Sequence, residues 1–458
     1  MPFLSSILKP RWQPLGGVLL CLIFFAVAWA LDLFLLETPV LTPFRSQPPL
    51  TPLYAFLIPV ARWSAWVFPL GAVLFVIAAP RLTDPDKVGR GRFMLVLSAC
   101  SMALPAALFL VRQPWGSLGF QLSIYPGEEV YYDALRIDDL SLFYAHYVEL
   151  MPKLSLHGKH FPPGHATLLY LSQLILGKST FAAAMVILFT FAAGTVLSYL
   201  AFSTLVRETA ARFASLVMLA CPSLLDFACT SMDAVFFAVA ALALWCSLAA
   251  LSRERGNLLG FTAGIALLLA TLFSFSVLPL GLVVALYACF SWRRLGSSAV
   301  TRLAMVALGY LVSAALLHLG TGFSVWGCFN QALRLNEEFM TSVIGMPPHQ
   351  LYFLIAYGNA AAFLIGSGLA LLPAVIIRFC HQGEPRSDAF SLATIITLAA
   401  MAFGGMYIME TERIWLFALP WVALTACAAS PPGNVLRLLL AAGLSQAYLM
   451  EVVLFTLW

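Results

Sequence analysis

The sequence predicts an all-α membrane protein, a polytopic transmembrane helical bundle of about 13 spans. Hydrophobic residues make up 61% of its 458 residues and charged residues 10%, whereas a soluble domain carries about 25% charged residues. The apolar runs are mostly near the length of about 20 residues that a helix needs to cross a bilayer. They also lack strand-like alternation, and open β-structure cannot satisfy its backbone groups in lipid.

The apolar runs place the predicted spans in order along the chain. Their approximate extents are 16–36, 54–79, 93–112, 180–206, 209–226, 232–251, 257–274, 276–291, 302–320, 351–378, 389–408, 413–429 and 435–457. The first run is too long for a signal-peptide core and has no evident cleavage site, which predicts a retained anchor. Residues 163–177 are also apolar but too short to span, so we expect them to lie flat on the outer membrane surface.

The basic residues predict the orientation. With a cytoplasmic N-terminus, 16 of the 25 Lys and Arg residues fall in short inner loops, as the positive-inside rule requires. The connections "RETAAR" and "SRERGN" stay on the inner side only if residues 163–177 do not cross the membrane, because one more span would place both connections outside. Compact loops and the absence of retention signals favour a bacterial inner membrane, with the long first loop on its periplasmic or extracellular face.

The span pattern predicts three parts of the chain. Residues 1–92 hold two N-terminal helices and an inner loop, residues 93–320 a catalytic core with a first outer loop over 113–179, and residues 321–458 an outer loop and the C-terminal helices. The nine cysteines are scattered without a CxxC pair, which is typical of small buried hydrophobes. No basic, aromatic-interleaved patch indicates nucleic acid.

The segment 125–166 gathers most of the candidate chemistry, with six of the 21 acidic residues and four of the seven histidines. Glu128 and Glu129 follow Pro126-Gly127 and begin a predicted helix, and Asp133 shares a helix face with Glu129. Paired carboxylates at a lipid–water boundary suit a general base or a cation site. The alternative is that acids in a first helical turn complement the helix dipole.

Two further acids in this segment have an equally plausible structural role. Asp138 and Asp139 are placed either to cap a second helix or to contact substrate.

The second half of the segment is basic. His157, Lys159 and His160 precede Pro162-Pro163 and suit the phosphate of an anionic lipid head group. The alternatives are a solvated basic loop and a structural metal site, which neither a cysteine nor a helical spacing supports.

Outside this segment, two boundaries of predicted spans carry charge. Asp233 starts a predicted span, as a helix cap or as a functional acid at membrane depth. Glu410, Glu412 and Arg413 precede another span. Either they form an internal ion pair, or Arg413 holds a phosphate while a glutamate contacts sugar hydroxyls.

The order of these motifs resembles the GT-C superfamily of membrane glycosyltransferases, in its protein-mannosyltransferase-like branch. The resemblance covers about residues 93–320, with the two N-terminal spans as an addition. Glu128-Glu129 stand at the family's acidic pair and Asp233 at its second-loop acid. "FPPG" stands where the family has His-Pro-Pro, and Phe161 replaces that histidine.

The resemblance implies inverting transfer of a sugar from a polyprenyl-phosphate donor at the outer face of the membrane. The sugar would be mannose or another hexose or pentose, and the acceptor a lipid, glycan or protein. Glu129 is then the expected base, with Glu128 second, while Asp133 and Asp233 orient acceptor or sugar. Lys159, His160 and Arg413 would neutralise phosphate, with His157 beside them, and a divalent cation, Mg²⁺ or Mn²⁺, could lie near Glu128, Glu129 and Asp233.

Two other classes compete with this enzyme. A lipid or glycolipid flippase would place polar groups at mid-membrane, often with internal repeats, and no repeat is evident in the sequence. A non-catalytic scaffold would leave the clustered outer acids unexplained.

Overall fold

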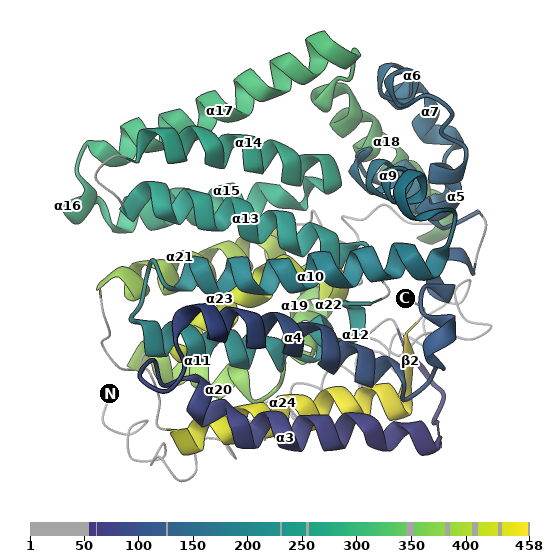
Figure 1. The fold of residues 1–458 in the computed structure, drawn as a ribbon. Coiled ribbons are helices and arrows are strands. Elements are labelled where there is room, and N and C mark those ends of the chain that lie inside the picture. The colour runs from purple at the N-terminus through teal and green to yellow at the C-terminus, as the bar shows by residue number, and fades with distance from the viewer. Residues whose placement is uncertain are drawn as a thin grey trace. The chain divides into compact units, whose positions relative to one another are not determined.

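The computed structural model describes residues 55–60, 62–124, 127–229, 231–252, 256–344, 352–380, 385–404, 411–428 and 433–456. Within them the chain is helical, apart from one short antiparallel pair, β1 (Ala55–Leu57) and β2 (Leu454–Thr456). The predicted all-α fold is confirmed (Figure 1). The predicted span 16–36 lies outside the described residues.

Seven helices in the described residues are long and apolar enough to cross a membrane. They are Trp63–Leu82, Arg90–Phe109, Thr180–Phe202, Asp233–Ser252, Ser298–Thr321, Pro385–Phe403 and Asn434–Val453. Shorter apolar helices cover Asn257–Phe273, Phe275–Phe290 and Leu416–Cys427. The chain therefore has the composition and helix lengths of an integral membrane protein, while the number of spans stays a prediction.

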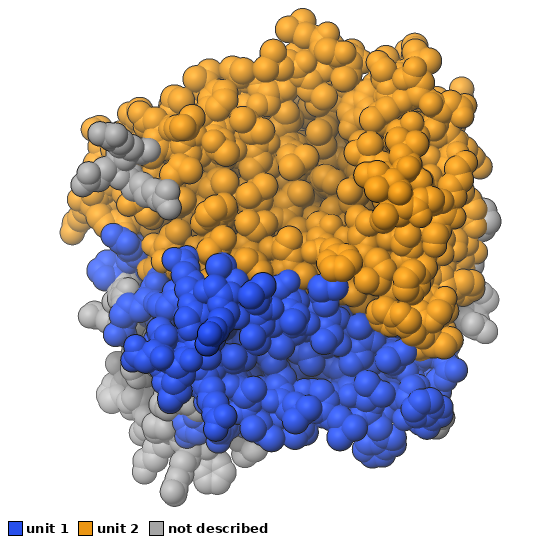
Figure 2. All heavy atoms as spheres, viewed as in Figure 1, with its two compact units in different colours: residues 1–112, 206–226, 348–457 blue, residues 113–205, 227–347, 458 orange. Residues whose placement is uncertain are grey.

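Two compact units make up the chain (Figure 2). Unit 1 consists of residues 1–112, 206–226 and 348–457, and unit 2 of residues 113–205, 227–347 and 458. The predicted parts 1–92, 93–320 and 321–458 follow the chain in order, whereas each unit gathers segments distant in sequence. The predicted core 93–320 contributes to both units.

Unit 1 is a helical bundle assembled from three stretches of chain. Its main helices are α3 (Val67–Leu82), α4 (Arg90–Phe109), α11 (Glu208–Leu219), α12 (Pro222–Phe227), α19 (Tyr352–Ser367), α20 (Leu371–Cys380), α21 (Pro385–Phe403), α22 (Thr411–Ile414), α23 (Leu419–Cys427) and α24 (Gly433–Val453). Helix α23 packs against α11, α20 and α21, and α24 packs against α3 and α11. The largest fully buried side chains of this bundle are Trp415 and Trp421.

The predicted continuous span 351–378 is two helices, α19 and α20. Gly368 adopts φ +102° between them, a conformation that side chains with a Cβ rarely adopt. Gln446 of α24 satisfies the broken backbone, because its Nε2 donates to Ile365 O at 2.7 Å and its Oε1 accepts from the Leu369 N–H at 2.8 Å. A break inside an apolar bundle persists only with such replacement partners.

Unit 2 contains four helices packed in succession. They are α10 (Thr180–Phe202), α13 (Asp233–Ser252), α14 (Asn257–Phe273) and α17 (Ser298–Thr321), and each contacts the next (Figure 1). Gly264 of α14 lets α17 approach, because a Cβ there would lie 2.1 Å from Val306 O. Gly309 does the same on α17, where a Cβ would lie 2.1 Å from Phe261 O. Small residues at such crossings are typical of membrane helices.

The rest of unit 2 carries the predicted outer loops. The first loop folds into α5 (Val130–Leu135), α6 (Leu140–Ala145), α7 (Tyr147–Leu150), α8 (Leu156–His160) and α9 (Gly164–Leu176), and α15 (Leu278–Phe290), α16 (Trp292–Leu295) and α18 (Val325–Ile344) complete the unit. The predicted loop 321–350 is thus largely helical in its described part. Helix α9 has 13 residues, or about 20 Å at 1.5 Å per residue, too short for a hydrocarbon core of about 30 Å.

Candidate functional site

The acidic and basic halves of the first outer loop lie side by side. The Leu156 N–H donates to Gly127 O at 2.9 Å, and the His157 N–H donates to Glu128 O at 3.1 Å. These two backbone bonds fasten the start of α8 to the turn that carries the acidic pair. Candidate acids and bases that are about 30 residues apart in sequence therefore share one place.

Glu129 and His157 form an acid–base pair at this place. Glu129 Oε2 lies 3.8 Å from His157 Nδ1, and the two side chains are 13% and 16% exposed. Glu129 stands at the N-cap position of α5, but its side chain makes no capping hydrogen bond there. The carboxylate is therefore directed toward the imidazole rather than toward the amides of its own helix.

Asp133 is buried beneath the pair and holds α8 in position. It is 3% exposed, and its Oδ1 accepts from the Ser155 N–H at 3.0 Å while its Oδ2 accepts from Ser155 Oγ at 2.5 Å. Ser155 Oγ in turn accepts from the Gly158 N–H at 3.1 Å and caps α8. Burial raises the pKa of Asp133, and the Ser155 hydrogen bonds oppose that rise.

Gly158 completes this arrangement. A Cβ at position 158 would lie 2.3 Å from Asp133 Oδ2, so only glycine leaves room for the carboxylate. Tyr147 closes the other side, where its hydroxyl donates to Phe161 O at 2.7 Å. Ser155, Gly158 and Tyr147 were not among the predicted site residues, although a serine directly before a short helix is an N-cap signature.

Asp139 is a helix cap. Its Oδ1 accepts from the N–H groups of Ser141 at 2.7 Å and Leu142 at 3.2 Å. The capping interpretation is confirmed for Asp139. Asp138 is exposed, and its substrate-binding role stays a prediction.

The basic residues of α8 differ in environment. Burial lowers the pKa of His160, and the charge of Lys159 lowers it further, so at neutral pH the imidazole is neutral. Its ring contacts Phe339 of α18 with 5.7 Å between centroids. The prediction that His160 neutralises phosphate is therefore disfavoured, and Lys159, which is partly exposed, is the cation that α8 offers.

Phe161, which departs from the family pattern, packs against His165. Their ring centroids are 5.0 Å apart, and His165 also faces Phe273 at 5.5 Å. His165 is 3% exposed, so it is a core residue of unit 2.

Asp233 begins α13 and is 4% exposed. Its Oδ2 accepts a hydrogen bond from Ser231 Oγ at 2.7 Å, and its backbone N–H donates to Ser231 Oγ at 3.1 Å. Across the described part of the chain, no three His, Cys, Asp or Glu side chains converge as a metal-binding group. Glu128, Glu129 and Asp233 are thus not gathered into a divalent-cation site.

The late charged motif belongs to unit 1. Glu412 and Arg413 lie in α22 and are 5% and 7% exposed, and neighbouring Thr411 donates from Oγ1 to Asn359 O at 2.7 Å. Glu410 lies outside the described residues. The roles of these three residues toward substrate stay predictions.

Comparison with known proteins gives a similarity in fold to solved structures. No protein-family model matches the chain, and no curated protein sequence matches it. The chain is similar to ArnT from Cupriavidus metallidurans in the apo state, with 16% identity and a TM-score of 0.40 over 66% of this chain and 57% of ArnT. Because the chain matches little more than half of ArnT, activity, substrates and partners are proposals for this protein.

Proposed function

We propose that the chain is an inverting membrane glycosyltransferase of the GT-C type. It would move a sugar, mannose or another hexose or pentose, from a polyprenyl-phosphate donor to an acceptor at the outer membrane face. The observation that carries the proposal is the Glu129–His157 pair, with 3.8 Å between Oε2 and Nδ1. The pair stands on a loop fastened by backbone bonds and by the buried Asp133–Ser155 contact.

The chemistry follows from the charges of this loop. Glu129 takes the proton from the acceptor hydroxyl, and the acceptor oxygen attacks the anomeric carbon from the face opposite the phosphate. The bond from the anomeric carbon to the phosphate oxygen breaks, and its electron pair leaves with the polyprenyl phosphate. Lys159 offsets the charge that develops there, while His157 orients the Glu129 carboxylate.

The surroundings of the loop suit a donor with a lipid tail. Helix α9 follows the loop directly and exposes Leu174 at 64% and Ile175 at 79%. Apolar side chains exposed on a short helix fit the membrane interface. A polyprenyl chain could then stay in hydrocarbon while its phosphate and sugar reach α8, and a lipid, glycan or protein acceptor could arrive from water.

The test is transfer of labelled sugar from polyprenyl phosphate to an acceptor in proteoliposomes. Glu129→Gln keeps the shape of the side chain but removes the base, and we expect turnover to fall about 10²–10⁴-fold. The matched control is Glu149→Gln, because Glu149 lies in the same loop with its side chain 80% exposed. Wild-type turnover in Glu129→Gln, Glu128→Gln and the double variant would refute the assignment.

The broken helix at Gly368 favours a second candidate, a lipid or glycolipid flippase, because discontinuous helices often form transport sites. However, Gln446 already occupies the backbone groups of Ile365 and Leu369 that such a site would offer to its substrate. Translocation of labelled lipid without a new glycosidic bond would favour the flippase over the transferase.

A further inference from the structure

The short helix α8, which carries His157 and Lys159, ends where the chain cannot supply the usual backbone donors. The last carbonyl groups of a helix have no partner inside it, and they commonly accept from the two amides that follow the C-cap residue. Phe161 is the C-cap of α8, and the next two residues are Pro162 and Pro163. Because proline has no backbone N–H, these two donors do not exist, and another group has to take their place.

Tyr147 of α7 supplies the missing donor. Its hydroxyl donates to Phe161 O at 2.7 Å and lies 3.3 Å from Gly158 O, so one side chain reaches two carbonyl groups at the end of α8. Tyr147 is 1% exposed, and burial raises the pKa of its hydroxyl well above the ordinary value for tyrosine. The hydroxyl therefore stays protonated, and it remains a donor, at neutral pH.

The ring of Tyr147 is held on two sides by other aromatic rings. Its centroid lies 5.1 Å from that of Phe143 and 5.9 Å from that of Phe323, and both pairs meet edge to face. Phe323 belongs to the connection between α17 and α18 and is 1% exposed. Packing of this kind favours one orientation of the ring, so it directs the hydroxyl toward the end of α8.

Helix α8 is thus fastened at both ends by buried side chains from different helices. Asp133 of α5 holds its start, because its Oδ2 accepts from Ser155 Oγ at 2.5 Å, and Tyr147 of α7 holds its end. His157 lies two residues after Ser155, whereas Lys159 lies between the two residues whose carbonyl groups contact Tyr147. The start of α8 therefore places the imidazole, and the end of α8 places the cation.

We propose that Tyr147 is a positioning residue for the phosphate of a polyprenyl-phosphate donor, and that it acts by placing Lys159. Lys159 is partly exposed and is the cation that the end of α8 offers to the phosphate oxygens. A cation stabilises a phosphate best where the fold holds it in place beforehand. This role rests on the proposed function for the identity of the ligand, and Tyr147, which is buried, acts without touching substrate.

The test is a double-mutant cycle on the full-length protein in nanodiscs, measured as affinity for polyprenyl phosphate without a sugar. Lys159→Met removes the cation, and we expect binding to weaken about 10–100-fold. Tyr147→Phe removes only the hydroxyl, and we expect binding to weaken about 3–10-fold by itself but less than about twofold beside Lys159→Met. Tyr144→Phe is the matched control, because the buried Tyr144 hydroxyl bonds instead to Thr167 of α9, and it should leave the affinity unchanged.

A second measurement separates positioning of the cation from general loosening of the loop. The pH dependence of turnover reports the ionisation of the essential base, which is Glu129 in the proposed mechanism. Because Tyr147 holds the other end of α8, we expect Tyr147→Phe to lower turnover about tenfold and to leave this pH dependence unchanged, whereas Ser155→Ala should alter it. A change of the pH profile in Tyr147→Phe as large as that in Ser155→Ala would assign Tyr147 a merely structural role and refute the proposal.

If Tyr147→Phe does not fold, Phe323→Leu takes its place in the cycle, because it retains the hydroxyl and loosens one side of the ring. We expect a smaller loss of affinity, which again disappears beside Lys159→Met. Additive losses would show that Tyr147 does not act through Lys159 and would overturn the proposal. Wild-type protein that binds polyprenyl phosphate but transfers no sugar would refute the proposed function, and the cycle would still decide the role of Tyr147, whereas wild-type protein that does not bind it would refute both.

Discussion

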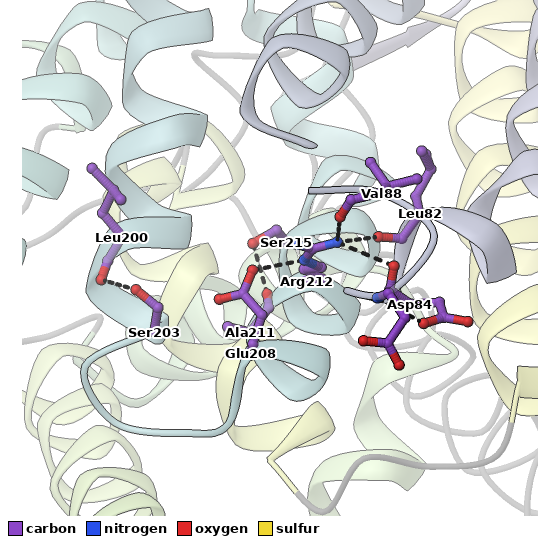
Figure 3. A network of polar contacts seen from close by, with 10 residues as sticks. Leu82, Asp84, Val88, Leu200, Ser203, Glu208, Ala211, Arg212 and Ser215 are labelled. Atoms are coloured by element: carbon purple, nitrogen blue, oxygen red, sulfur yellow. Dashed lines mark hydrogen bonds and ion pairs between the residues drawn. The ribbon is translucent and has the colours of Figure 1, made fainter. Parts of the chain in front are cut away.

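Arg212 and Arg112 both lie in unit 1 with buried side chains, and their surroundings differ. Arg212 of α11 is 1% exposed and donates from Nε to Glu208 Oε1 at 2.7 Å. Its Nη1 reaches the carbonyl oxygens of Leu82 at 3.3 Å and Val88 at 2.5 Å, on the connection between α3 and α4 (Figure 3). Its guanidinium also lies 4.9 Å from the ring centroid of Phe93. Arg112 instead lies at the end of α24, where its Nε is 3.6 Å from Glu451 Oε1 and donates to Glu451 O at 2.6 Å.

The difference separates structural charge from functional charge. At Arg212 one acid meets one base, and carbonyl oxygens of the connection after α3 accept from Nη1. The loop of unit 2 holds two kinds of acid: Asp133 accepts hydrogen bonds from Ser155, whereas Glu129 Oε2 lies 3.8 Å from His157 Nδ1.

Removing the side chain of Arg212 has the largest expected effect on stability. Arg212→Ala leaves Glu208 without its counter-charge and frees the connection that follows α3, and we expect a loss of about 3–5 kcal/mol in the free energy of unfolding. Chemical denaturation in a mild detergent measures it. Arg92→Ala, which removes an exposed arginine of the same unit, should change the free energy of unfolding by no more than about 0.5 kcal/mol. Equal effects of the two substitutions would contradict a structural role for Arg212.

Adding a side chain at Gly158, beside Asp133, should have a smaller effect on the free energy of unfolding. In Gly158→Ala the new Cβ would stand 2.3 Å from Asp133 Oδ2, so α8 must shift, at a cost of about 1–3 kcal/mol. If Asp133 positions His157 and Lys159, transfer by the folded variant falls as well. Gly177→Ala tests strain without crowding, because Gly177 adopts φ +82° with no atom within 4 Å of a Cβ there. Full activity in Gly158→Ala would show that the placement of α8 does not matter for transfer.

The sequence predicted what depends on local pattern. The predicted spans 180–206 and 232–251 correspond to α10 and α13. A long apolar run is enough to predict such a helix, whatever distant residues it packs against. The approach of Glu129 to His157 was not predicted, because it depends on how distant parts of the loop fold together. Which acid would be buried could not be predicted, because Asp133 takes its donors from Ser155, 22 residues away. The break at Gly368 was missed for the same reason, since Gln446, which satisfies it, lies 77 residues beyond Leu369.

Removing a single cap should have a modest effect. Asp139→Ala deletes the acceptor for two amides of α6, and we expect a loss of about 1 kcal/mol. Asp138→Ala removes an exposed neighbour that caps nothing among the described contacts, and it should be close to neutral in stability. A loss of transfer in Asp138→Ala with unchanged stability would support its predicted role toward substrate.

The smallest effect appears only on acidification. Burial holds the pKa of His160 below its usual value of 6.5, so between these two values the unfolded chain binds more protons than the folded one. The contribution of His160 to stability is therefore lost as pH falls through this window, with a slope of at most about 1.4 kcal/mol per pH unit for one proton. His160→Phe should remove this slope, while His146→Gln, with an exposed side chain, should retain it. Asp133 has a raised pKa and opposes the trend, but its contribution cancels when wild type and variant are compared at each pH. An identical pH dependence in wild type and His160→Phe would show that His160 is not held neutral, and it would restore His160 beside Lys159 as a second cation for phosphate.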